Sequence, residues 1–323
     1  MKVGIHSLDV VTPLGRMTVD TIARMQKVSP ADLLEQIGVY EKPVLEPGQE
    51  IFPYAAQVSK KVIAAAGISP RDIGVVVYAS CGVSDRQMWS PAAWVQNQVG
   101  AVGSCAFDIQ NGCNSGNLGM QVASSILSQH TGRPYGLLVV ADQLSGIIDY
   151  ANPAQQKYFC FADGATAILL SKENYRYEIG SFSSITKGEY GDSLHLKKGE
   201  EKIWVRDDED EEKMLADEYL LEYPQRIRRV LEKEGLQPPD INHIFMNQAD
   251  HKLLGRLAVA LGIPLDTIHA SYRSYGHIGG SDIFLGLKTR EAEGRIKKGD
   301  RMLLSSSAFG FSWGSSLLTK VKD

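Results

Sequence analysis

The stretch GISPRDI at residues 67–73 decides the fold, because it recurs later in the chain as GLQPPDI at residues 235–241. Each copy leads into a short apolar run, VVVY at 75–78 after the first and IFM at 244–246 after the second. An apolar run of this length after a turn is typical of a buried strand. The repeated opening therefore indicates an internal duplication of strand-containing units.

The similarity between the two copies continues downstream of these runs. In the first half, a strand at 106–109 leads through Gly112 and Cys113 to a helix at 118–127 and a strand at 137–141. In the second half, a strand at 267–270 leads through Gly276 and His277 to a helix at 284–291 and a strand at 302–305. Strands that alternate with helices predict an α/β fold with right-handed crossovers and mostly parallel sheets.

The two halves are expected to pack with helices between their sheets. The helix after Cys113 suits that place because it carries small residues for close approach on several sides, namely Gly116, Gly119, Ala123, Ser124 and Ser125. Charge rises near residues 172–212, where DDEDEE at 207–212 indicates a solvated loop and the start of a helix. We therefore assign the halves to residues 1–172 and 173–323.

Composition excludes several classes of protein. The 323 residues are 43% hydrophobic and 22% charged, as in ordinary globular chains. A formal net charge of −4 argues against nucleic acid or anionic lipid as the main partner, and the longest apolar runs are too short to span a membrane. The four cysteines form no CxxC pair and no zinc spacing, which predicts a reducing, cytoplasmic compartment. Without HExxH, GxxxxGK[ST] or GxGxxG motifs, we expect no metal and no cofactor.

Cys113 lies in a setting that favours chemistry. It follows the turn at Asn111 and Gly112 and opens the predicted helix. A thiol at a helix N-terminus meets free N–H groups and a partial positive charge, which favour the thiolate. Its own backbone N–H is suited to stabilise an oxyanion. Cys81, Cys105 and Cys160 lack such a setting, and we expect them to be inert because cysteine is usually buried filler.

His277 is the expected partner of this thiol. It lies in YGHIGG at 275–280, the equivalent turn of the second half. Pseudo-twofold symmetry would bring the two turns together, and a neighbouring imidazole lowers the pKa of a thiol and can hold its proton. The pair predicts a cysteine nucleophile activated by histidine.

Five short motifs, taken in their order and spacing, carry a resemblance to a known family. They are DIQNGC at 108–113, FADGA at 161–165, NQAD at 247–250, GH at 276–277 and AFGFSWG at 308–314. With them the chain resembles the β-ketoacyl-acyl-carrier-protein synthase III-like branch of the thiolase superfamily over nearly its whole length. The resemblance implies a thiolase-like duplicated α-β-α-β-α layered fold with two pseudo-twofold-related halves.

The resemblance also implies a reaction. In the family, a cysteine takes an acyl group from a coenzyme A or carrier-protein thioester, and a malonyl thioester loses CO₂ and attacks the acyl-enzyme. Cys113 matches the nucleophile, and Gly310 matches the glycine whose N–H completes the oxyanion hole. Asn247 stands where the family has His, and His277 stands where it has Asn, so the two residue types are exchanged. An amide and an imidazole can still supply two donors to an enolate oxygen.

The exchange leaves the acyl acceptor open. We rank first a condensation with a malonyl-type thioester, in specialised metabolism or in fatty-acid or polyketide initiation. A histidine that deprotonates a hydroxyl or an amine would instead give an O- or N-acyltransferase. The third alternative is a non-catalytic partner subunit of a condensing heterodimer, although such subunits typically lack the cysteine.

The donor and the assembly follow from the same resemblance. Residues 31–40 lack the Trp and Arg that clamp coenzyme A in relatives. Lys252 and Arg256 would suit a phosphopantetheine phosphate or an acidic carrier protein, which favours acyl carrier protein over acyl-CoA; the alternative is a solvated helix face. Trp89 falls near the residue that in the family crosses the dimer interface and closes the partner's acyl pocket. A bulky side chain there predicts a short or branched acyl group, with ordinary interface packing as the alternative.

Overall fold

The computed structural model describes residues 2–84, 86–129, 132–206, 208–247, 253–269 and 271–323. Over these residues the main sheet has ten strands, in the order β12-β11-β13-β14-β8-β1-β7-β6-β4-β5. The strands of the first half are β1 (Gly4–Val11), β4 (Ile73–Ser80), β5 (Cys105–Gln110), β6 (Tyr135–Gln143) and β7 (Asp163–Ser171). Those of the second half are β8 (Tyr177–Thr186), β11 (His243–Met246), β12 (Ile268–His269), β13 (Arg301–Ala308) and β14 (Ser312–Lys320).

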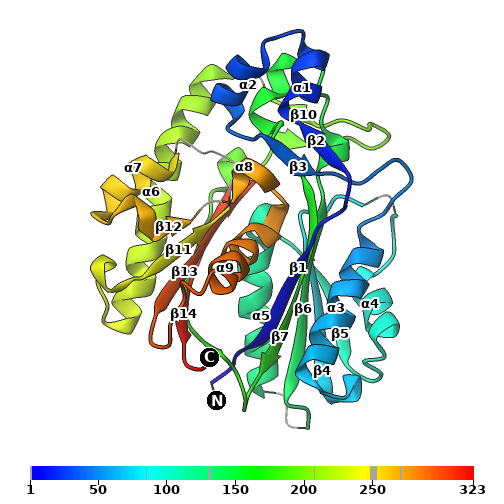
Figure 1. The fold of residues 1–323 in the computed structure, drawn as a ribbon, viewed down its shortest axis with the longest axis vertical. Helices are drawn as coiled ribbons and strands as arrows, with labels where there is room; N and C mark the ends of the chain where they lie inside the picture. The colour runs from blue at the N-terminus through cyan, green and yellow to red at the C-terminus, as the bar shows by residue number, and fades with distance from the viewer. Residues whose placement is uncertain (1, 85, 130–131, 207, 248–252, 270) are drawn as a thin grey trace.

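The strand order of one half repeats that of the other. The first half reads β5-β4-β6-β7-β1 and the second reads β12-β11-β13-β14-β8. The halves meet where Gly4 and Ile5 of β1 pair with Glu178 and Tyr177 of β8. The repeated order confirms the predicted duplication, and Figure 1 shows the two half-sheets diverging from this junction.

Strand direction corrects one expectation. In each half only three strands are parallel, β4 with β5 and β6, and β11 with β12 and β13. β7 and β1, and likewise β14 and β8, run antiparallel to their neighbours. The prediction of mostly parallel sheets is wrong because the chain between β13 and β14 is only residues 309–311, far too short for a parallel crossover.

Two helices lie between the half-sheets, as predicted. α5 (Ser115–Gln129) packs against β4 and β6 of the first half and β13 and β14 of the second, while α9 (Asp282–Ala292) packs against β11, β13 and β1. A Cβ on Gly116 would lie 2.4 Å from the carbonyl oxygen of Gly280, so this glycine permits a close approach of the halves. Ser125, expected in the same contact, is instead exposed.

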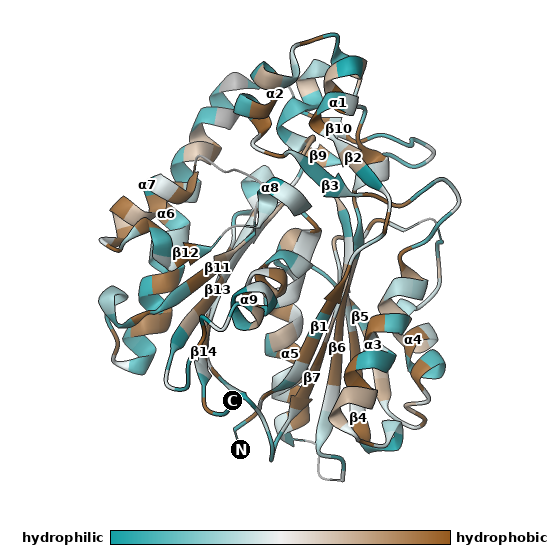
Figure 2. Ribbon diagram, in the orientation of Figure 1, coloured by the Kyte–Doolittle hydropathy of each residue, from teal (hydrophilic) through white to brown (hydrophobic). Residues whose placement is uncertain are grey.

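The remaining helices cover the outer faces. α3 (Phe52–Ala66) and α4 (Pro91–Val99) cover the first half, and α6 (Glu209–Glu234) and α7 (Leu253–Leu261) cover the second. Figure 2 shows apolar residues concentrated in the strands that these helices cover. No helix in the described ranges combines the length and the apolar character needed to cross a bilayer.

The smaller elements gather at one end of the molecule, at the top of Figure 1. They are α1 (Val19–Gln26), α2 (Pro30–Ile37), α8 (Tyr272–Tyr275), β2 (Arg16–Thr18), β3 (Glu41–Pro43), β9 (Leu194–His195) and β10 (Trp204–Val205). β2 pairs with β3, and β9 pairs with β10. The parallel strands β4, β5 and β6 point their carboxyl ends toward this cap, where ligands bind in many α/β sheets.

Candidate active site

Cys113 lies where the first half turns from strand to helix. It is the middle residue of the 3₁₀ turn η2 (Gly112–Asn114), which follows β5 and continues into α5. Gly112 has a φ of +49° and its α-carbon faces Ala308, so a side chain there would meet the second half. Only 2% of Cys113 is exposed. The turn therefore buries the sulfur at the start of a helix and against the other half.

His277 reaches the same place from the second half. Its backbone forms an isolated parallel β-bridge with Phe161. The N–H of His277 donates to the carbonyl of Cys160 at 2.7 Å, and the carbonyl of His277 accepts from the N–H of Ala162 at 2.8 Å. Its Nε2 lies 2.9 Å from Sγ of Cys113. The sequence predicted that these two side chains would meet, and the structure brings them into hydrogen-bond contact.

Asp282 completes this arrangement, and the sequence reasoning missed it. Its Oδ2 contacts Nδ1 of His277, and its Oδ1 accepts from the N–H of Ile278 at 2.9 Å. All of Asp282 except 1% is buried, at the first residue of α9. A carboxylate that holds Nδ1–H leaves Nε2 to face the thiol, as in catalytic triads. The available signal was an aspartate five residues after the histidine in HIGGSD.

The three groups are electrostatically linked. Burial alone would lower the pKa of His277, but the charges of Cys113 and Asp282 and its hydrogen bonds to both raise that pKa well above its usual range. The pKa of Cys113 is lowered, first by a hydrogen bond from Cys81 and then, against burial, by the charge of His277 and its hydrogen bond. The site therefore favours a thiolate–imidazolium pair near neutral pH.

Cys81, which the sequence suggested is inert filler, lies beside the sulfur of Cys113. It follows β4 directly, and its Sγ lies 3.6 Å from Sγ of Cys113. It is half-buried and lines a cavity, whereas Cys160 is buried and Cys105 is exposed at the sheet edge. All four cysteines are free thiols. Two thiols thus share the site, and only one was expected there.

Asn247, which was expected to donate a hydrogen bond to an enolate oxygen, is buried and held by its neighbours. Its Oδ1 accepts from the hydroxyl of Tyr223 at 2.5 Å and from the N–H of Ser307 at 3.1 Å. Its Nδ2 donates to the carbonyl of Ser307 at 3.0 Å. Tyr223, on α6, has its pKa raised well above 10 by burial and by nearby charges that include Cys113, so it lies within electrostatic reach of the sulfur. No sequence pattern marked Tyr223 as part of the site.

Gly310 lies in the turn between β13 and β14 and has a φ of +108°. The same turn lies against the nucleophile segment, since a Cβ on Gly112 would be 3.4 Å from the backbone nitrogen of Phe309. Behind the turn, Asn117 donates to Ser306 at 2.8 Å and accepts from Ser316 at 2.7 Å. These buried hydrogen bonds fix the serine-rich hairpin against the start of α5.

A buried lysine holds the strand that positions His277. Nζ of Lys42 donates to the carbonyls of Phe159 at 2.6 Å and Phe161 at 2.5 Å and to the hydroxyl of Tyr150 at 2.7 Å. Burial lowers the pKa of Lys42 to about 7. Three acceptors match the three hydrogens of an ammonium group, so the segment that bridges His277 is tightly fixed.

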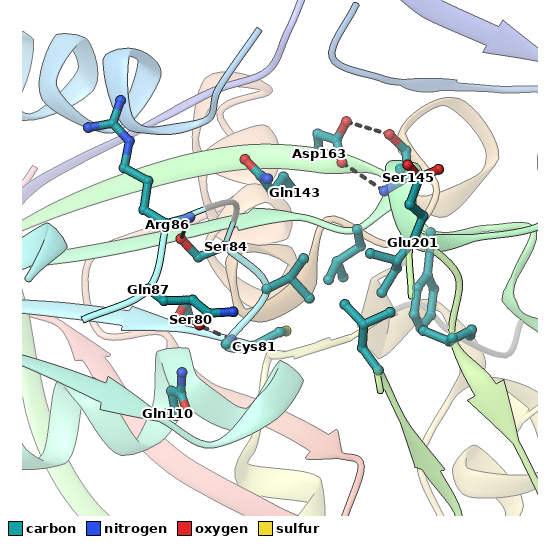
Figure 3. A pocket seen from close by; sticks show the side chains of 18 of the residues that line it. Ser80, Cys81, Ser84, Arg86, Gln87, Gln110, Gln143, Ser145, Asp163 and Glu201 are labelled. Atoms are coloured by element: carbon teal, nitrogen blue, oxygen red, sulfur yellow. Dashed lines mark hydrogen bonds between the residues drawn. The ribbon is translucent and has the colours of Figure 1, made fainter. Parts of the chain in front are cut away.

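The site borders a cavity of about 1180 Å³. Cys81, Gly112, Phe161 and Phe309 line it on the side of the nucleophile, and residues 194–201 and Ile203 line the opposite side. Figure 3 shows that many of the lining side chains are polar, among them Gln87, Gln110 and Gln143. Among the described residues, no group of His, Cys, Asp and Glu side chains is arranged to hold a metal ion.

The structure describes two of the three remaining predicted residues, Trp89 and Arg256. Trp89 lines the cavity, packs edge-on against Phe52 with ring centroids 4.5 Å apart, and donates from Nε1 to Ser84 at 3.4 Å. Arg256 is exposed on α7. Lys252 lies outside the described residues.

The comparisons with known proteins agree with this geometry. Two family models match, 3-oxoacyl-[acyl-carrier-protein] synthase III over residues 107–188 and its C-terminal domain over residues 231–320, and together they span more than half of the chain. The β-ketoacyl-[acyl-carrier-protein] synthase III of Aquifex aeolicus is 25% identical over 320 residues, covering 96% of each chain.

Solved structures show the same fold. The 3-oxoacyl-(acyl carrier protein) synthase III of Pseudomonas aeruginosa matches with a TM-score of 0.89 at 22% identity, over 100% of this chain and 99% of that one. A cysteine-to-serine variant of Xanthomonas campestris OleA, solved with lauric acid and lauroyl-CoA, matches with a TM-score of 0.87 at 16% identity over 99% of both chains. The repeated strand order, the buried cysteine at the head of α5 and the two family matches lead to one conclusion: the chain belongs to the 3-oxoacyl-[acyl-carrier-protein] synthase III family of acyltransferases, within the thiolase superfamily.

Proposed function

We propose that this chain transfers an acyl group through a thioester on Cys113. The observation that carries the proposal is the contact of Cys113 with His277, which is backed by Asp282. The thiolate attacks the carbonyl carbon of a donor thioester, and the donor sulfur leaves with the electron pair and takes the proton of His277. A thiolate already formed in the resting site makes this attack fast.

The oxyanion of that step needs donors beside Cys113. We assign this role to the backbone N–H groups of Cys113 and Gly310. The contact of the turn at 308–311 with Gly112 supports the assignment, because it places the two segments side by side.

For the acceptor we propose a malonyl-type thioester, as in the condensing enzymes to which the chain is related. Loss of CO₂ leaves an enolate whose carbon attacks the acyl group on Cys113. His277 and Asn247 are the proposed donors to the enolate oxygen. Support for Asn247 comes from its burial and from its fixation by Tyr223 and Ser307, which hold the amide in one orientation.

A second candidate is transfer to an alcohol or an amine, and Asp282 favours it. Once His277 has given its proton to the departing donor, it is a neutral imidazole whose Nδ1–H is held by a carboxylate. That arrangement suits a general base that takes the proton of an incoming hydroxyl or amine. The same triad argues against a non-catalytic partner subunit, because such a subunit needs no activated thiol.

The donor is proposed to be an acyl thioester of acyl carrier protein, with acyl-CoA as the alternative. The relatives are named for acyl-carrier-protein chemistry, while the OleA variant is named with bound lauroyl-CoA. Arg256 supports the first donor, since it is an exposed cation on α7 that no described side chain neutralises. A chemistry that depends on a free thiolate also fits a reducing, cytoplasmic compartment.

We further propose a homodimer formed along β5. This strand is one of the two edge strands of the ten-stranded sheet, and Cys105, Asp108 and Gln110 are exposed on it. An open strand edge can pair with a second copy, and Trp89 and the cavity lie on the same side of the molecule. Trp89 would then bound the acyl pocket near the interface and restrict it to short or branched acyl groups.

The test begins with the acyl-enzyme. The protein is incubated with acyl-carrier-protein or acyl-CoA donors and digested, and the Cys113 peptide should carry the mass of the acyl group. Cys113→Ala should abolish transfer, while Cys160→Ala, which removes another buried thiol, should leave it largely intact. Equal losses in both variants, or an unmodified Cys113 peptide with every donor, would contradict the proposal.

The acceptor is decided in a second assay. Acyl-enzyme is mixed with malonyl-carrier labelled at the free carboxyl, and condensation should release labelled CO₂. No labelled CO₂, together with an ester or amide product from an added alcohol or amine, would establish the second candidate.

A further inference from the structure

The nucleophile has a second thiol beside it that no step above uses. Sγ of Cys81 lies 3.6 Å from Sγ of Cys113, within hydrogen-bond distance for two sulfur atoms. Cys81 is the first residue after β4, and β4 pairs with β5 so that Ser80 lies opposite Gln110. The two thiols are therefore delivered by adjacent parallel strands, whose carboxyl ends lie at the same edge of the sheet.

The backbone holds Cys81 in this position. Its N–H donates to Oδ1 of Asp142 at 2.6 Å, while Oδ2 of the same carboxylate accepts from the N–H of Gly280 at 2.9 Å. Asp142 lies near the end of β6 and is only 2% exposed. One carboxylate thus ties the segment that carries Cys81 to the segment that follows His277, so the distance between the sulfurs is set by the frame of the site.

The charge of Cys113 makes a second donor useful. The sulfur is 2% exposed, and a buried anion without enough hydrogen bonds is costly. Five titratable groups interact with it: Cys81 after β4, Asp142 at the end of β6, Tyr223 on α6, His277 in the segment before η8 (Gly279–Ser281), and Asp282 at the start of α9. Both oxygens of Asp142 accept from backbone N–H groups, and Asp282 contacts His277, so among these side chains the imidazolium of His277 and the thiol of Cys81 are the donors in contact with the sulfur.

The proton of the pair belongs on Cys81. Its hydrogen bond to Cys113, together with burial and the nearby charge of Asp142, raises the pKa of Cys81 well above the usual value for a thiol. The pKa of Cys113 is shifted the other way, because it is the sulfur that contacts His277. Cys81 therefore stays a neutral S–H group that points its hydrogen at a thiolate.

We propose that Cys81 is a further catalytic residue, whose thiol donates a hydrogen bond to the sulfur of Cys113 whenever that sulfur is negatively charged. The inference rests on the proposed role of Cys113 as the nucleophile. Before acylation, Cys81 stabilises the attacking thiolate. When the acyl group leaves, the S–C bond breaks, the electron pair returns to the Cys113 sulfur, and Cys81 stabilises it again. Cys81 keeps its own proton in both steps.

The test measures the ionisation of Cys113 without any acyl donor. The rate of alkylation by iodoacetamide is followed on the Cys113 peptide by mass spectrometry across pH, in the wild type, Cys81→Ala, Cys81→Val and Cys81→Ser. Losing one hydrogen bond to a charged sulfur should move the midpoint of the alkylation profile up by about one pH unit in the alanine and valine variants. Serine retains a hydrogen-bond donor, so the midpoint of the serine variant should lie between those of the wild type and the alanine variant.

Cys160→Ala is the matched control, because it removes a buried thiol near His277 that does not contact Cys113; its midpoint should equal that of the wild type. Cys81→Val keeps the bulk of the side chain and decides the question if the alanine variant is unstable. Unchanged midpoints in the alanine and valine variants would overturn the inference. Equal shifts in the serine and valine variants would also overturn it, since packing rather than donation would then be the cause.

The two proposals fail in different ways. Alkylation requires no thioester, so the expected shift without any acylation of Cys113 would contradict the proposed function and leave the role of Cys81 in ionisation intact. Normal acylation of Cys113 with no shift in any Cys81 variant would contradict the inference alone.

Discussion

The two halves of the molecule share a strand order but differ in the side chains that their central turns present. In the first half the turn after β5 presents Cys113, and the residue five positions later is Leu118. In the second half the corresponding segment presents His277, and the residue five positions later is Asp282. One copy thus presents a thiol, and the other presents an imidazole with a carboxylate behind it.

The halves also differ in the length of their outer strands. β4 and β5 run over Ile73–Ser80 and Cys105–Gln110, whereas their counterparts β11 and β12 cover only His243–Met246 and Ile268–His269. The first half lines the cavity together with residues 194–201, Ile203 and Phe309 of the second half, whereas α7 and β12 do not line it. The two halves thus keep the same strand order, while their central turns and their edge strands differ.

The largest effect should come from removing the charge of Asp282, because the first half has the uncharged Leu118 at the corresponding position. Asp282→Asn keeps the shape but turns an N–H toward Nδ1 of His277, which disfavours the productive tautomer. We expect acyl transfer to fall by about 100- to 10,000-fold, as for asparagine at the equivalent place in other triads.

The pH profile gives the direction of this effect. Both charges of the pair coexist between the lowered pKa of Cys113 and the raised pKa of His277. Removing the charge of Asp282 lowers the pKa of His277. The pH range in which the enzyme is active should therefore end at a lower pH, while its acid limit stays set by Cys113. Asp266→Asn, which changes an exposed carboxylate of the same half, serves as the control and should behave like the wild type. A normal rate and profile in Asp282→Asn would show that His277 works alone.

An intermediate effect should come from separating the halves. Gly116→Ala places a Cβ 2.4 Å from the carbonyl oxygen of Gly280, so the backbones must move apart. We expect the free energy of unfolding to fall by about 1–3 kcal/mol, measured by urea denaturation.

Gly255→Ala is the matched change in a helix of the second half, where nothing lies within 4 Å of the new Cβ. It should be neutral or stabilising by up to about 1 kcal/mol. If both variants lose the same stability, the close approach of the halves is not what constrains Gly116.

The smallest effect should come from the support of Asn247. Tyr223→Phe removes one of two hydrogen bonds to Oδ1 and leaves the one from Ser307. A single hydrogen bond is worth about 0.5–1.5 kcal/mol, so we expect a two- to tenfold loss in the step that uses Asn247. Release of CO₂ from the malonyl donor should slow more than acylation of Cys113. Equal slowing of both steps would argue against a role for Asn247 in the enolate.

The sequence was sufficient to predict the duplication and the two reactive turns. Local patterns in the sequence carry this information, namely the repeated openings at 67–73 and 235–241 and the glycines beside Cys113 and His277. The position of α5 between the half-sheets was also predictable, because a helix with small residues on several sides needs partners on several sides. What failed was strand direction, since β7 and β14 run against their neighbours; for β14 the reason is the connection of only residues 309–311.

Identity and spacing of residues by themselves determined the family, the repeated α/β order and the expectation that Cys113 and His277 would meet. Only the tertiary structure decided what surrounds them: Cys81 against Cys113, Tyr223 on Asn247, and Lys42 behind His277. The physical reason is that each of these contacts joins segments far apart in the chain, through strand pairing and helix packing. A hydrogen bond across such a distance leaves no periodic trace in the sequence.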